Sequence, residues 1–287
     1  ILIFCVECKN IFDHLLIKLL LTGLGLIFIL GSCIQEEWGV GNITRPEGAG
    51  RGEWNKNKTI EVFFITELSN SSVSEYDAII SFFQKKDKAC SLGVVERLDG
   101  NYALASSSSP EQFGPTKVAF ETTRFSSFAF NRFNGSSMEG SSILFNHKLN
   151  SERSFKVTDD CFIKFINIQA KSMTDTPINI LVPFSTVRFE SKSQIASAAA
   201  GALKTLTGIS YEALIIGTVK TDLFTELQAV TNQIKGYSLV EATKGQESAY
   251  TLFVLGPTSW VLREMTQESV SNNLNAYCLK IESSVNL

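Results

Sequence analysis

The spacing of apolar residues changes near residue 190 of this chain. Before that point, short runs of β-branched and aromatic residues predict strands, and one run at helical spacing predicts a helix. Strands are expected at 60–65, 92–98, 142–147, 162–169 and 179–189, a helix at 74–86, and a hairpin over 117–133 that turns at Asn134-Gly135. The segment 59–190 is therefore predicted to be a β-rich domain.

The C-terminal part shows the longest helical pattern. Apolar residues recur every three or four positions and predict one stripe on an amphipathic helix, formed by Tyr211, Ile215, Val219, Leu223, Leu227, Val230 and Ile234. Gly236 is placed to end that helix, and strands are expected at 237–243 and 250–255. A helix laid on this hairpin buries the stripe, so 191–287 is predicted to be a helix-hairpin domain. The expected fold class is α+β: a mixed β-rich body with a C-terminal amphipathic helix packed on a hairpin.

The N-terminal part contains an apolar run that is typical of an export signal. Lys18 precedes twelve residues, Leu19 to Leu30, that carry no charge. An export signal needs about 7–15 apolar residues, whereas a membrane-spanning helix needs about 20. Residues 1–32 are therefore predicted to be a signal peptide. Its first dozen residues are expected to be upstream read-through or a truncated end, because the first methionine is Met138.

The end of the apolar run, Leu30-Gly31-Ser32-Cys33, resembles the lipobox of bacterial lipoproteins. The resemblance implies signal-peptide cleavage between Ser32 and Cys33 and a diacylglyceryl group on the thiol of Cys33. Two or three acyl chains hold a protein stably at a membrane. Ile34, where Asp would imply retention at the inner membrane, implies delivery to the outer membrane. An uncleaved anchor helix and a conventional signal peptide with a chance cysteine remain alternatives.

Residues 33–58 are predicted to be the lipidated cysteine and a flexible tether, because they are rich in glycine and lack an apolar period. The C-terminal part is similar to small envelope-lipoprotein modules of the LPP20 and TRL-like families, in which a helix precedes a glycine-led hairpin. Gly236, Leu239, Val240 and Phe253 occupy the comparable places. This resemblance implies no catalytic residues.

Composition narrows the chemistry. The net charge of −3 offers no basic excess for phosphate contacts, which argues against nucleic acid as a partner. The chain has two histidines, His14 and His147. Only His147 remains after cleavage, so no metal site built from several histidines is expected, and no cofactor is expected. Cys90, Cys161 and Cys278 could form one disulfide and leave one thiol, or all three could be buried thiols.

Catalytic patterns are scarce. No GxSxG motif is present, and a serine hydrolase would have to use His147 as its base, with Asp159 or Asp160 to orient it. The leading hypothesis is therefore a non-enzymatic envelope lipoprotein with a binding or structural role. Its expected partners are membrane lipid, through acylated Cys33, and an envelope protein. The alternatives are a tethered envelope hydrolase that uses His147 and an assembly factor of an envelope complex.

Overall fold

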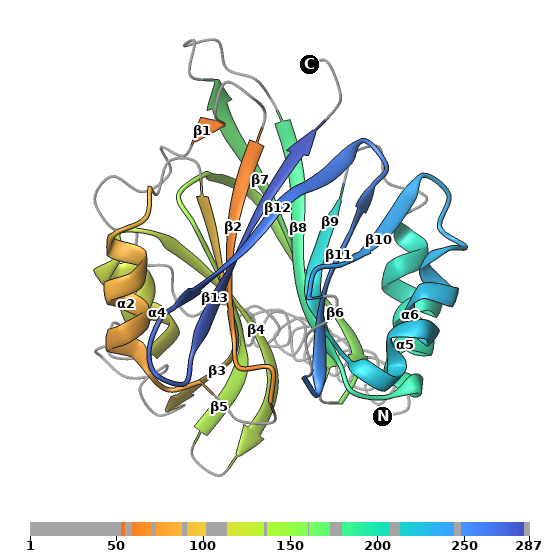
Figure 1. The fold of residues 1–287 in the computed structure, drawn as a ribbon, viewed down its shortest axis with the longest axis horizontal. Helices are drawn as coiled ribbons and strands as arrows, with labels where there is room; N and C mark the ends of the chain where they lie inside the picture. The colour runs from red at the N-terminus through yellow and green to blue at the C-terminus, as the bar shows by residue number, and fades with distance from the viewer. Residues whose placement is uncertain are drawn as a thin grey trace, which may run out of the picture. The chain divides into compact units, whose positions relative to one another are not determined.

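The computed structural model describes residues 53–54, 59–69, 73–87, 91–101, 114–134, 137–159, 161–172, 180–206, 213–243 and 248–283. These residues lie in the compact unit Gly41–Leu287, which Figure 1 shows as two facing β-sheets with helices on both outer sides. In the described part of the chain, no helix combines the length and the apolar character that crossing a membrane requires.

The first sheet has six strands in the order β12-β13-β2-β3-β5-β4. Their bounds are β2 Thr59–Thr66, β3 Ser91–Asn101, β4 Phe125–Asn134, β5 Ser137–Phe145, β12 Trp260–Ser269 and β13 Asn275–Ser283. Helices α2 (Tyr76–Gln84) and α4 (Gly114–Glu121) cover its outer face. Because β2 and β3 are parallel, the crossover through α2 is the unit that builds the centre of this sheet.

The second sheet runs in the order β1-β7-β8-β9-β11-β10, and β6 pairs with β7. The strands are β1 Glu53–Trp54, β6 Lys148–Thr158, β7 Cys161–Ser172, β8 Ile180–Phe189, β9 Leu214–Lys220, β10 Tyr237–Glu241 and β11 Tyr250–Pro257. Helix α5 (Lys192–Ala198), a π-helical turn (Ala199–Leu203), a 3₁₀ turn (Thr221–Leu223) and helix α6 (Phe224–Thr231) lie on its outer side. Strands β8 and β9 are parallel, so each sheet contains a parallel pair joined through a helix. The short strand β1 also pairs with β7 in parallel.

The core consists of three main apolar layers. The layer between the sheets takes residues from both of them, including Phe64 and Leu279 from the first and Phe184 and Leu252 from the second. The two other layers join each sheet to its own helices. Both faces of the central strands are therefore covered, which explains why β9 and β11 are buried at nearly every position.

The predicted C-terminal amphipathic helix is wrong. The segment that was expected to form it contains β9, the 3₁₀ turn and α6, a helix of eight residues. Ile215 and Val219 do share one face, because a spacing of four is an even number and also fits the period of a strand. The fold is a β-rich body of two sheets, and the predicted helix packed on a hairpin is not part of it.

Most predicted strands of the β-rich region are confirmed. β2, β3, β7 and β8 coincide with their predicted segments within a few residues, and α2 coincides with the predicted helix. The predicted hairpin over 117–133 is wrong in its first half, which is α4. The division between domains at residue 190 stays a prediction, and the strands on either side of it, β8 and β9, pair with each other.

Candidate functional site

The candidate site lies where the parallel pairs β2–β3 and β8–β9 end. Inward-facing positions that are apolar earlier in β2, β3 and β9 become polar there, at Thr66, Glu96 and Thr218, and Arg188 in β8 faces the same place. All four side chains are buried. The carboxyl ends of parallel strands are the usual place for ligands in sheets that helices cover. The topology therefore brings four polar groups, distant in sequence, to one such position.

An ion pair between the two sheets forms the centre of the site. Nη2 of Arg188 lies 3.3 Å from Oε2 of Glu96, which also accepts a hydrogen bond of 2.7 Å from the hydroxyl of Thr66. Nε of Arg188 donates to Oγ1 of Thr218 over 2.9 Å, and that hydroxyl donates to Oε1 of Glu96. Glu96 has no exposed surface, so these partners replace its hydration.

A close approach of β8 and β9 sets Arg188 beside Thr218. The two residues are register partners, and the preceding pair is Val187 and Gly217. A Cβ atom at Gly217 would lie only 1.9 Å from the carbonyl oxygen of Val187. Glycine at this position therefore allows the spacing of the two strands that the site requires.

A β-bulge in β3 directs a second charged residue into the site. The register of β3 against β5 shifts between Val95 and Leu98, and Arg97 has the left-handed φ of 53°. Val95 and Leu98 both pack in the outer layer, which regular alternation would not allow. Because the bulge adds one residue, Glu96 and Arg97 both turn to the inner side.

Arg97 extends the site toward solvent. Its Nε lies 3.2 Å from Oε1 of Glu139, its Nη2 donates to Oε2 of Glu139 over 3.2 Å, and its Nη1 lies 3.6 Å from Oε1 of Glu190. The Glu139 side chain is 6% exposed, whereas that of Glu190 is 39% exposed. Glu190 is therefore the carboxylate of this group that water reaches most easily.

Tyr250 connects the two arginines. The centre of the Arg188 guanidinium lies 3.8 Å from the centroid of the Tyr250 ring, and the phenol donates to Oε1 of Glu190 over 3.4 Å. Burial, and then the charge of Glu190, raise the pKa of Tyr250. The phenol consequently keeps its proton at neutral pH. We call this group the ionic cluster; its members are Thr66, Glu96, Arg97, Glu139, Arg188, Glu190, Thr218 and Tyr250.

His147 lies away from the ionic cluster. It follows β5 at the Phe145 end, while Glu139 is at the other end of the same strand, since β3 and β5 pair Gly93 with Leu144 and Asp99 with Glu139. Burial, and then the charge of Arg124, lower the pKa of His147 to about 4. The structure therefore does not bring His147 into the candidate site, and its environment makes it a weak base.

The other predicted site residues also lie elsewhere. Cys161 and Cys278 are buried in different apolar layers, so they do not pair with each other. The thiol of Cys161 donates to the carbonyl of Arg188 over 3.6 Å. Ser32, Cys33 and Cys90 lie outside the described residues. Lipidation and cleavage therefore stay predictions, as does a disulfide that involves Cys90.

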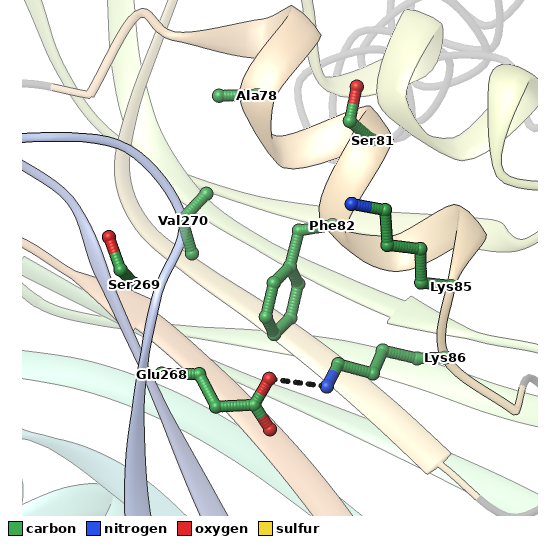
Figure 2. Close-up of a pocket in the computed structure, with 8 residues that line it drawn as sticks. All are labelled: Ala78, Ser81, Phe82, Lys85, Lys86, Glu268, Ser269 and Val270. Carbon is green, nitrogen blue, oxygen red and sulfur yellow. Dashed lines mark hydrogen bonds and ion pairs between the residues drawn. The ribbon is translucent and has the colours of Figure 1, made fainter.

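A separate pocket lies between α2 and the strand end of β12. Its volume is about 190 Å³, and Figure 2 shows Phe82 between the two walls, with Lys85 and Lys86 on one side and Glu268 on the other. Lys86 pairs with Glu268 over 2.6 Å and lies 4.7 Å from the Phe82 ring centroid. Two lysines and a carboxylate around one aromatic ring define no reaction, so the ionic cluster remains the candidate site.

The fold is that of endonuclease/exonuclease/phosphatase proteins. The structure of the endonuclease/exonuclease/phosphatase from Beutenbergia cavernae matches with a TM-score of 0.53 and 9% identity over 79% of this chain and 72% of that one. An endonuclease/exonuclease/phosphatase family protein from Leptotrichia buccalis matches with a TM-score of 0.53 and 11% identity over 78% of this chain and 99% of that one. No family model matches the sequence, and no curated protein matches it.

These matches correct two expectations from the sequence. The expectation of a non-enzymatic protein is contradicted, because the similar folds belong to hydrolytic enzymes by name. The exclusion of nucleic acid is also withdrawn, because proteins named as endonucleases and exonucleases share this fold. Net charge alone did not justify the exclusion, because a protein with a negative net charge can still carry a local positive site that attracts phosphate.

The residues of the ionic cluster do not fit a divalent cation. Nucleases and phosphatases often clamp the reacting phosphate with such ions, which require several oxygen ligands. Across the described ranges, no group of three or more His, Cys, Asp and Glu residues could hold a metal. Glu96, the most central carboxylate, already accepts from Thr66, Thr218 and Arg188.

Sequence reasoning missed every member of the ionic cluster. A signal was present in two apolar strand patterns, because Glu96 and Arg97 interrupt one of them and Arg188 interrupts another. Charged residues inside such patterns are rarely buried unless they have partners. The interruptions therefore marked positions that required partners from other strands.

Proposed function

We propose that this protein is a hydrolase that acts on phosphate esters at the ionic cluster. The observation that carries the proposal is the position of the cluster, at the carboxyl ends of the parallel pairs β2–β3 and β8–β9 in a fold shared with endonuclease/exonuclease/phosphatase proteins. The guanidinium of Arg97, which faces the partly exposed Glu190, suits anionic phosphate oxygens. This assignment replaces the role that the sequence suggested for His147.

Three members of the cluster have roles in this proposal. Glu190 accepts a proton from water as the water oxygen attacks phosphorus, and its partly exposed side chain supports that role. The leaving oxygen takes a proton from the phenol of Tyr250 as the ester bond breaks. Arg97 stabilises the negative charge on the phosphoryl oxygens through Nη1, which faces Glu190.

The test is hydrolysis by the purified full chain in detergent. The substrates are 4-nitrophenyl phosphate, bis(4-nitrophenyl) phosphate and a single-stranded oligonucleotide. Glu190→Gln removes the base and is expected to lower kcat/KM by about 10²–10⁴-fold. Glu264→Gln is the matched control, because Glu264 pairs with Lys280 at the exposed surface of the other sheet. A wild-type chain that hydrolyses none of the substrates, or equal losses in the two variants, would contradict the proposal.

We also propose that the hydrolase is anchored in the bacterial envelope through acylated Cys33, at the outer membrane. The support is the order of Lys18, the apolar run and the lipobox in the sequence. In bacterial cells, radiolabelled palmitate is expected on the wild-type chain and is expected to be lost from Cys33→Ala. A chain that keeps its label after this substitution, or that separates from membranes without detergent, would rule out the anchor.

A further inference from the structure

The guanidinium of Arg188 lies in a cage of oxygen atoms. One wall is the carboxylate of Glu96, at 3.3 Å from Nη2, and another is the hydroxyl of Thr218, at 2.9 Å from Nε. The segment just after β2 supplies two main-chain carbonyl oxygens. Nη1 donates to the carbonyl of Ser69 over 3.1 Å, and Nη2 donates to the carbonyl of Glu67 over 3.4 Å.

These oxygen atoms are of the types that coordinate hard cations. Carboxylate, hydroxyl and main-chain carbonyl oxygens coordinate Ca²⁺ and Mg²⁺ in proteins, and they come here from two sheets. In this chain they surround a cation that is covalently part of β8. The Tyr250 ring covers the face of this guanidinium.

A divalent ion would have no remaining place in this cage. Both oxygens of Glu96 are already engaged, Oε1 by Thr218 and Oε2 by Thr66 and Arg188. An added ion would also be repelled by the fixed charge of Arg188 at a few ångströms, in an interior that screens charge weakly. Arg188 would have to leave its four oxygen partners before the ion could bind.

We infer that Arg188 takes the place of a divalent cation in the ionic cluster, so that the cluster carries its own fixed positive charge and binds no divalent metal. Arg188 is a positioning residue here, because it holds Glu96 and Thr218 and supports the ring of Tyr250. This inference concerns binding and does not rest on turnover. If the proposed hydrolysis occurs, it is expected to continue in the presence of EDTA.

The test uses Mn²⁺ as the probe, with the full chain in detergent and electron paramagnetic resonance of unbound Mn²⁺ as the readout. The wild-type chain is expected to leave the signal unchanged. Arg188→Ala empties the cage and is expected to bind Mn²⁺ in equimolar amount, with a rise in Tm on adding Mn²⁺. Arg188→Gln, which keeps more of the side-chain volume, is the second variant if the first does not fold.

Arg263→Ala is the matched control, because it removes an arginine from an exposed ion pair with Glu282 and is expected to gain no Mn²⁺ site. Wild-type binding that Glu96→Gln abolishes would overturn the inference, and so would folded Arg188 variants that bind no Mn²⁺. Wild-type binding that Glu96→Gln leaves unchanged lies elsewhere and agrees with the inference. Failure of the hydrolysis assay alone would contradict the proposed function and leave the inference about Arg188 unchanged.

Discussion

The interior between the two sheets is apolar along most of its length and ionic at one end. Val62, Phe64 and Leu279 in the apolar part have no exposed surface, and the same is true of Glu96 and Thr218 in the ionic cluster. Burial therefore does not distinguish the two regions. What distinguishes them is that every polar group of the central ion pair has a partner from another strand.

This comparison separates stability from function. Burial of apolar surface stabilises a fold by about 25 cal/mol per Å². A buried ion pair gives little net stability, and apolar residues of similar volume often serve as well or better. The apolar part explains why the sheets associate, whereas the ionic cluster is better explained by the proposed function. The variants below test whether the two regions differ in this way.

The largest effect is expected from breaking the central ion pair. Arg188→Met leaves the charge of Glu96 buried without its cation and is expected to lower the free energy of unfolding by about 3–5 kcal/mol. Urea denaturation at neutral pH measures this change. The exposed arginine of the Arg263–Glu282 pair gives the comparison, because Arg263→Met is expected to cost less than about 1 kcal/mol.

The double variant Glu96→Leu/Arg188→Met sharpens the result. It removes both charges, so most of the lost stability is expected to return. If the double variant is as unstable as Arg188→Met, unpaired charge is not the cause of the loss. The contrast between the two regions would then fail.

The second effect concerns His147, at the opposite end of β5 from the cluster. Burial and the charge of Arg124 lower its pKa from 6.5 to about 4 in the folded chain. Between these values the unfolded chain binds the proton and the folded chain does not, so stability is full above pH 6.5 and falls as the pH decreases toward 4. The expected loss attributable to His147 is about 2 kcal/mol between pH 7 and pH 5.

Unfolding by urea at a series of pH values, compared with His147→Gln, measures this contribution. The variant is expected to show a flatter pH dependence in that range, because glutamine does not titrate. Equal slopes for the two chains would show that folding does not lower the pKa of His147. The ionic cluster keeps its charges by pairing them, whereas His147 is expected to remain neutral.

Local sequence patterns predicted much of the β-rich region and failed where two periods coincide. β2, β7 and β8 were predictable because β-branched and aromatic residues fill them. The segment from Tyr211 to Ile234 was not, because its apolar residues are four apart and fit both a strand and a helix. β12 is mostly exposed, so its sequence carries too few apolar positions to indicate a strand.

The ionic cluster could not be predicted for a different reason. Thr218 and Glu96 are 122 positions apart in sequence, and no local pattern indicates that their strands face each other. The inward direction of Arg97 depends on the bulge in β3, which a sequence read as regular alternation places on the outer face. The charges were visible in the sequence, but their partners required the topology.

The smallest expected effect is the difference in cost between one substitution in each region. Thr66→Val keeps the side-chain shape and removes the hydroxyl that donates to Glu96 over 2.7 Å. It is expected to lower the free energy of unfolding by about 1.5–3 kcal/mol, because the acceptor is charged and buried. Ile143→Val in the apolar part removes one methylene group and is expected to cost about 1 kcal/mol. Urea denaturation of both variants gives the difference.

If the cost of Thr66→Val does not exceed that of Ile143→Val, the remaining donors satisfy Glu96 without Thr66. The cluster then tolerates the loss of a partner as the apolar part tolerates the loss of a methylene.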